Sequence, residues 1–166
     1  MFSGQLSRID ANKIDRDYIL SDEFYILFKK TLEKVRFEYQ QEKIQLFKNF
    51  LIKSSLKNLS STPLEIKKEY LLNKLETITL EHFLILEWYF KNNFMTRERL
   101  GVDFSVKKQS DLPNVTPLYE EYENDLVSLG FLHDDTAGRI SPPVRYCFPS
   151  KLGKIFQEFI HYDDIE

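Results

Sequence analysis

The distribution of glycine and proline limits how this 166-residue chain folds more than any other feature of its sequence. Between Gln5 and Leu100 the chain has no glycine and a single proline, Pro63. From Leu112 onward it has three glycines and five prolines. Because glycine and proline interrupt regular elements, we expect helices in the first part of the chain and short elements joined by turns in the last part.

Apolar spacing and capping residues divide the first part of the chain into helices. Ser21 is a candidate N-cap, and the apolar residues after it recur at steps of three and four, as on one face of a helix: Phe24, Phe28, Leu32, Val35 and Tyr39. One helix of about 35 residues and two helices with a break near Gln40 both fit this pattern. Thr62-Pro63 and Thr79 predict two further helix starts, the second before a nearly all-apolar helix over residues 80–93.

The last part of the chain contains signals for two helices and two strands. Thr116-Pro117 predicts the start of a helix, and Gly130 suits the position just past its end. Strands are predicted over residues 131–133 and 144–148, and Ser150 is predicted to cap a last helix from Leu152 to about Ile160. Together these elements predict a mainly α fold in three parts: a polar arm (1–20), a helical module (21–78) that is one long helix or a helical hairpin, and a third domain (79–166).

The order helix, loop, helix ending in Leu-Gly, strand, turn, strand, helix resembles a winged-helix domain. The run from Leu126 to Leu132 is similar to the step that leaves a recognition helix. The run from Tyr146 to Phe156 is similar to the return strand and closing helix of the multiple-antibiotic-resistance-regulator family. The resemblance covers residues 79–162 and implies a winged-helix domain with a small two-stranded antiparallel wing. Residues 12–55 also resemble helical segments of uncharacterised bacterial or phage proteins, some of them associated with abortive infection.

Charge is distributed unevenly along the chain, although the net charge is only −3. Residues 29–58 hold eight Lys or Arg against three Glu, a net +5. This stretch fits either the solvated face of an amphipathic helix or a surface for RNA, DNA or another anionic partner. Residues 112–135, which include the expected recognition helix, hold six acids and no Lys or Arg. Since DNA affinity depends on neutralising phosphates, this pattern argues against the usual docking of such a helix.

Two binding functions therefore compete. In the first, the chain is a nucleic-acid-binding regulator in which Asn124 contacts a base and four cations contact phosphates: Lys107, Lys108, Arg139 and Arg145. In the second, it is a protein-interaction or dimerisation module, related to phage or host defence, whose acidic helix binds a basic partner through Glu120, Glu121, Glu123 and Asp125. A solvated surface is the alternative for each of these residues.

Catalytic and metal-binding motifs are missing from the sequence. It has no glycine-rich phosphate loop or nucleophile elbow, and the three histidines are too far apart for a recognisable ligand motif. His82 is expected near a helix start, and the single cysteine, Cys147, is expected to point into a core. We therefore expect no enzyme activity, no cofactor and no metal.

Location and self-association are also predicted. No apolar run approaches the roughly 20 residues that span a bilayer, and the N-terminus lacks the apolar core of a secretory signal, so we expect a cytoplasmic protein. The chain holds 14 Phe, 9 Tyr and 1 Trp, more than one small core is expected to hide. Together with the long N-terminal helical segment, this aromatic content predicts a homo-oligomer formed through the N-terminal helices, as in winged-helix regulators by resemblance.

Overall fold

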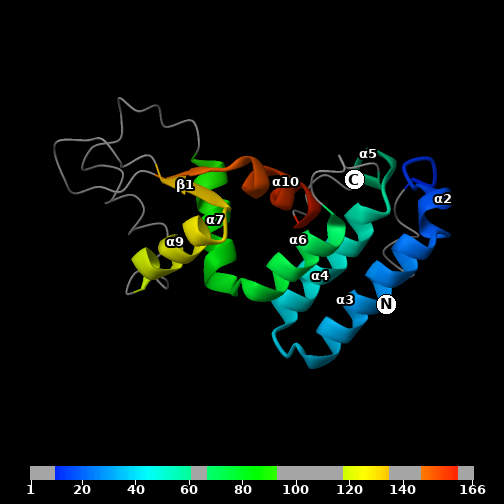
Figure 1. Ribbon diagram of the computed structural model, residues 1–166, viewed down its shortest axis with the longest axis horizontal. Coiled ribbons are helices and arrows are strands. Elements are labelled where there is room, and N and C mark those ends of the chain that lie inside the picture. The colour runs from blue at the N-terminus through cyan, green and yellow to red at the C-terminus, as the bar shows by residue number, and fades with distance from the viewer. Residues whose placement is uncertain (1–9, 61–66, 93–117, 135–146, 161–166) are drawn as a thin grey trace. The chain divides into compact units, whose positions relative to one another are not determined.

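The computed structural model describes residues 10–60, 67–92, 118–134 and 147–160 (Figure 1). Of these residues, 74% lie in helices, and a two-stranded antiparallel sheet lies near the C-terminus. The expectation of a mainly α fold with a small two-stranded sheet is therefore confirmed. The chain divides into two compact units, which are described separately: a first unit of Met1–Ile78 with Phe156–Glu166, and a second unit of Thr79–Ile155.

The first unit is built on a helical hairpin. It contains α2 (Arg16–Ile19), α3 (Asp22–Phe37), α4 (Gln41–Ser54), α5 (Lys57–Ser60), α6 (Lys68–Thr77) and the end of α10 (Lys151–Ile160). Of the two arrangements that the sequence left open, the two-helix one is correct. The carboxylate of Glu38 accepts hydrogen bonds from the amides of Tyr39 (2.9 Å) and Gln40 (3.0 Å). The break is stabilised because these bonds satisfy backbone amides at the point where the helical hydrogen bonding stops.

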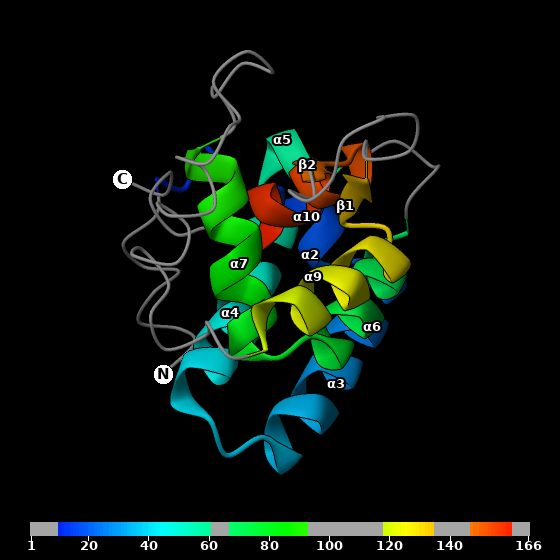
Figure 2. The same ribbon diagram turned by 90° about the vertical axis from the view of Figure 1, so that its left-hand side faces the viewer.

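Helices α3, α4 and α6, which are labelled in Figure 2, contact one another. Each of them contributes buried apolar side chains to the core of the first unit. The N-cap expected at Ser21 is confirmed, because its hydroxyl accepts from the amide of Phe24 at 3.2 Å. The end of α10 contributes Phe159, whose ring lies 5.6 Å from that of Phe50. The largest fully buried side chains of this unit all belong to Phe, Leu or Ile residues: Phe47, Phe50, Ile52, Leu71, Leu72, Leu75, Ile78, Phe156 and Phe159.

The second unit contains α7 (Leu80–Lys91), α9 (Tyr119–Ser128), β1 (Leu132–Asp134), β2 (Cys147–Pro149) and the start of α10. Helices α7 and α9 contact each other, and each contacts one strand of the sheet. A capping box starts α7: the amide of Thr79 donates to Nδ1 of His82 at 3.1 Å, and the amide of His82 donates to the hydroxyl of Thr79 at 3.5 Å. The expected cap at Thr79 and the place of His82 near the helix start are confirmed.

The end of α9 and the start of β1 form one continuous turn. Gly130 has φ +82°, and the amide of Phe131 donates to the carbonyl of Leu126 at 2.9 Å. This is the glycine-ended turn expected at position 130. Strand β1 begins at Leu132 rather than at the expected Phe131. The amide of Phe131 bonds to the helix end, while its carbonyl accepts from the amide of Ser150 at 2.9 Å. The strands are paired so that His133 faces Phe148.

The burial of Cys147 and the cap at Ser150 were also predicted from the sequence. Cys147 is buried at 3% exposure, as expected. Ser150 caps α10, since its hydroxyl accepts from the amide of Gly153 at 2.9 Å. The helix starts expected at Thr62-Pro63 and Thr116-Pro117, and residues 144–146 of the second expected strand, lie outside the described residues.

Replacing Gly153 by alanine is expected to destabilise the protein, although this substitution usually stabilises a helix. Gly to Ala inside a helix ordinarily stabilises by about 1 kcal/mol. At this position an added Cβ would lie 2.3 Å from the carbonyl oxygen of Phe131, a backbone atom that cannot turn aside. We expect Gly153→Ala to lower the free energy of unfolding by about 1–3 kcal/mol, measured by urea denaturation. Lys154→Ala, at the exposed neighbouring position, should change it by less than about 0.5 kcal/mol; a stabilised Gly153→Ala protein would contradict the close approach.

Candidate functional site

The expected recognition helix, α9, presents an acidic surface. Glu120, Glu121, Asn124 and Asp125 are exposed, and the helix contains no Lys or Arg. We call Glu120, Glu121 and Asp125, with Asn124 among them, the acidic face. Asn124 is therefore accessible, but carboxylates surround it. A phosphate backbone brought to this helix would meet negative charge at short range.

Glu123 lies on the opposite side of α9 from the acidic face. The sequence pattern placed it among the surface acids, but it is 1% exposed. It shares the inward face with Leu126, and its carboxylate accepts a hydrogen bond from the hydroxyl of Tyr89 on α7. Burial raises the pKa of Tyr89 well above 10, and the nearby carboxylate of Glu123 raises it further. Glu123 thus links α9 to α7 and does not contribute to an interaction surface.

Asp125 on the acidic face is joined to α7 through a histidine. Nε2 of His82 lies 3.3 Å from Oδ2 of Asp125. Nδ1 of the same ring accepts from the amide of Thr79, so in the neutral imidazole the proton must be on Nε2, which then donates to Asp125. The ring of Tyr122 packs edge-on against the imidazole at 4.9 Å. The sequence predicted the helix cap at Thr79, but it did not predict the contact between His82 and Asp125.

The remaining expected nucleic-acid contacts are Lys107, Lys108, Arg139 and Arg145. All four lie outside the described residues.

The basic stretch over residues 29–58 does not form a single cationic surface. Lys30 pairs with Glu69, and Lys34 pairs with Glu76, both on α6. Lys43 lies 3.7 Å from Glu38 and donates to the carbonyl of Glu76 at 2.9 Å. Since Glu69 and Glu76 lie outside the stretch, its apparent net charge of +5 is partly neutralised by folding.

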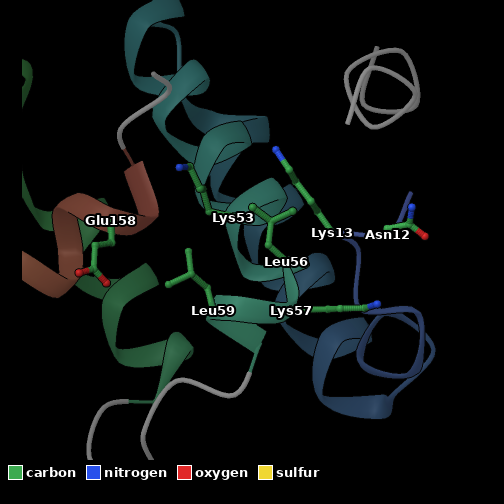
Figure 3. A pocket seen from close by; sticks show the side chains of 7 residues that line it. All are labelled: Asn12, Lys13, Lys53, Leu56, Lys57, Leu59 and Glu158. Atoms are coloured by element: carbon green, nitrogen blue, oxygen red, sulfur yellow. The ribbon is translucent and has the colours of Figure 1, made fainter. Parts of the chain in front are cut away.

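A cavity of about 620 Å³ in the first unit gathers lysines from separate segments (Figure 3). We call it the lysine pocket. It is lined by Asn12, Lys13, Lys53, Leu56, Lys57, Leu59 and Glu158.

Backbone pairing brings two of these lysines together. The amide of Lys57 donates to the carbonyl of Lys13, and the amide of Asp15 donates to the carbonyl of Ser55, both at 2.9 Å. Ile14 and Leu56 form an isolated antiparallel bridge between these bonds. Positions 13 and 57 are thus held adjacent, although 43 residues separate them in the chain.

The residues that line the lysine pocket include three lysines and one glutamate. Lys13 and Lys57 are exposed, whereas Lys53 is 4% exposed. In Figure 3, Glu158 lies on one side of Leu56 and Leu59, and Asn12 and Lys57 lie on the other. Ammonium groups that share a cavity repel one another, and an anionic group placed among them relieves that repulsion. The arrangement is suited to a phosphate or a similar anion.

A second, smaller cavity of about 330 Å³ lies beside α2, α3 and α6. Nζ of Lys68 sits 3.6 Å above the ring of Tyr18 and donates to the carbonyl of Ser54 at 3.3 Å. Burial lowers the pKa of Lys68 to about 8, against the opposing effect of Glu23 and Asp15. Burial also raises the pKa of Tyr18. These contacts fix α2 against the rest of the unit, and we assign the cavity no ligand.

Substitutions at Tyr89 and Glu123 test whether the hydrogen bond between these two residues stabilises the fold. Tyr89→Phe removes the hydroxyl donor and leaves a buried carboxylate with one hydrogen bond fewer, so the free energy of unfolding should fall by about 1–3 kcal/mol. Changing Glu123→Leu in the same chain removes the acceptor as well and should recover part of that loss. Urea denaturation followed by circular dichroism measures both. Equal stability of the wild type and Tyr89→Phe would show that the bond carries no net stabilisation.

Within the described ranges no group of three His, Cys, Asp or Glu side chains is placed to hold a metal ion. No helix there has both the length and the apolar character needed to cross a bilayer. The chain matched no family model, no curated protein and no solved structure with which it was compared.

Proposed function

We propose that this chain is a non-enzymatic nucleic-acid-binding protein that holds phosphates in the lysine pocket of its first unit. The observation that carries the proposal is that Lys13, Lys53 and Lys57 all line one cavity. Lysine is a common phosphate ligand, because its ammonium group acts as a compact positive charge. A pocket held by backbone hydrogen bonds also presents its cations without first having to order the segment that carries them.

The second unit supports a regulator role by its architecture. The order α7, α9, β1, β2, α10, with a glycine-ended turn between α9 and β1, is compatible with the winged-helix resemblance. In this proposal α9 is not the surface that reads DNA, because its exposed side carries three carboxylates. A cytoplasmic setting is consistent with a chain whose single cysteine is buried.

Salt-dependent binding tests the proposal. Binding is measured by fluorescence anisotropy with a labelled nonspecific DNA duplex and with a labelled single-stranded RNA. We expect binding at about 50 mM salt that weakens steeply by about 200 mM salt. The double variant Lys13→Ala/Lys57→Ala should bind about tenfold more weakly. It should also reduce the slope of log affinity against log salt by about 1.4 to 1.8, the effect of two lost phosphate contacts.

A matched control removes the same charge elsewhere. Lys67 and Lys154 are exposed and do not line the lysine pocket. Lys67→Ala/Lys154→Ala should retain most of the affinity and the slope. Absence of binding at low salt would refute a nucleic-acid function, and equal losses in the two double variants would refute the pocket as its site.

A second function is favoured by the acidic face alone: α9 binds a basic protein partner. Its exposed side offers Glu120, Glu121 and Asp125 without an intervening cation. In that case Glu120→Gln/Glu121→Gln should abolish the binding of an oligolysine peptide, measured by anisotropy at low salt. Under the nucleic-acid proposal the same variant leaves the affinity for DNA unchanged or slightly higher.

A further inference from the structure

Helix α3 of the first unit leaves large apolar side chains on its solvent side. Its inner face is buried through Phe24, Leu27 and Thr31. Its other faces expose four large apolar residues to between 50% and 81%: Tyr25, Ile26, Leu32 and Phe37. With 3.6 residues per turn, Tyr25 and Leu32 lie along one edge of the solvent side of α3 and Ile26 along the other. Charged residues, Asp22, Lys29 and Arg36 among them, lie between these edges, and we call this side of the helix its outer face. Single exposed apolar residues are common on proteins, but a concentration on one helix of 16 residues indicates a contact surface.

Charge on this helix is divided between its ends. The first turn is acidic, with Asp22 and Glu23, and the last turn is basic, with Lys34 and Arg36. Lys34 is paired with Glu76 on α6. Arg36 is exposed and lies 5.7 Å from the centre of the Phe37 ring. The outer face therefore has a negative end at Asp22 and a positive end at Arg36.

Such a face is complementary to itself in one orientation only. When two copies cross antiparallel about an axis near residue 29, Asp22 of each faces Arg36 of the other. A parallel pair would instead set Asp22 against Asp22 and Arg36 against Arg36. The two helix dipoles also favour the antiparallel arrangement. Lys29 lies near the axis, and Glu33, four residues further along the same helix, offsets part of the repulsion there.

We propose that two copies of this chain associate through the outer faces of their α3 helices, packed antiparallel, with Asp22 of one copy beside Arg36 of the other. A helix of 16 residues is about 24 Å long, so a contact made by α3 alone falls at the low end of specific interface sizes. We therefore expect a weak dimer with a dissociation constant of roughly 1–100 µM. The proposal does not depend on the nucleic-acid function.

Charge exchange between two variants is the decisive test, with sedimentation equilibrium of the full chain as the readout. Asp22→Arg sets two arginines against each other at both ends of the dimer, and Arg36→Asp sets two acids together in the same way. Each variant alone should have a dissociation constant at least about threefold higher than the wild type. An equimolar mixture should recover association, because the heterodimer sets the two exchanged side chains against each other as an opposite-charge pair. Asp22 and Arg36 are about 21 Å apart along one helix, so contact within a single copy cannot produce this recovery.

Apolar substitutions give an independent measurement. Leu32→Gln should weaken association about tenfold, the effect of removing one apolar contact from each side. Leu84→Gln, at a comparably exposed leucine on α7, should leave it unchanged. Circular dichroism verifies that every variant keeps its helix content. A wild-type chain that is monomeric at about 100 µM, a variant mixture that associates no better than its components, or equal effects of the two leucine changes would each overturn the proposal.

Discussion

Two backbone hydrogen bonds join the N-terminal segment to the end of α4, and the candidate site depends on them. The amide of Asp15 donates to Ser55 and the amide of Lys57 donates to Lys13. They convert residues expected to form a polar arm into one wall of a cavity. Because Lys53 and Lys57 also line this cavity, the pocket concentrates positive charge in a protein whose net charge is −3.

Folding redistributes the charge that the linear sequence displays. Glutamates of α6 pair with lysines of α3, so the basic stretch is reduced to a smaller set of cations. Glu123 is bonded to Tyr89 inside the second unit, so three of the four carboxylates on α9 remain exposed. The folded chain still has a basic and an acidic region, but fewer residues contribute exposed charge to each than the sequence suggests.

Local features of the fold were predictable because their hydrogen bonds span only a few residues. The caps at Ser21, Thr79 and Ser150 each bond an amide three residues away. Gly130 ends α9 because a positive φ is accessible to glycine without strain. The break between α3 and α4 was left open, since the bonds from Glu38 that stabilise it do not appear in the periodicity of apolar residues.

The sequence by itself determined the mainly helical character, the helix caps and the burial of Cys147, all of which follow from short-range spacing and residue type. Only the tertiary structure decided that Lys13 meets Lys57, that Glu123 turns inward and that Asp125 contacts His82. Each of these contacts joins residues more than 30 positions apart. Their formation depends on how helices pack against one another, because the side of a helix that is buried is set by its neighbours as well as by its own sequence.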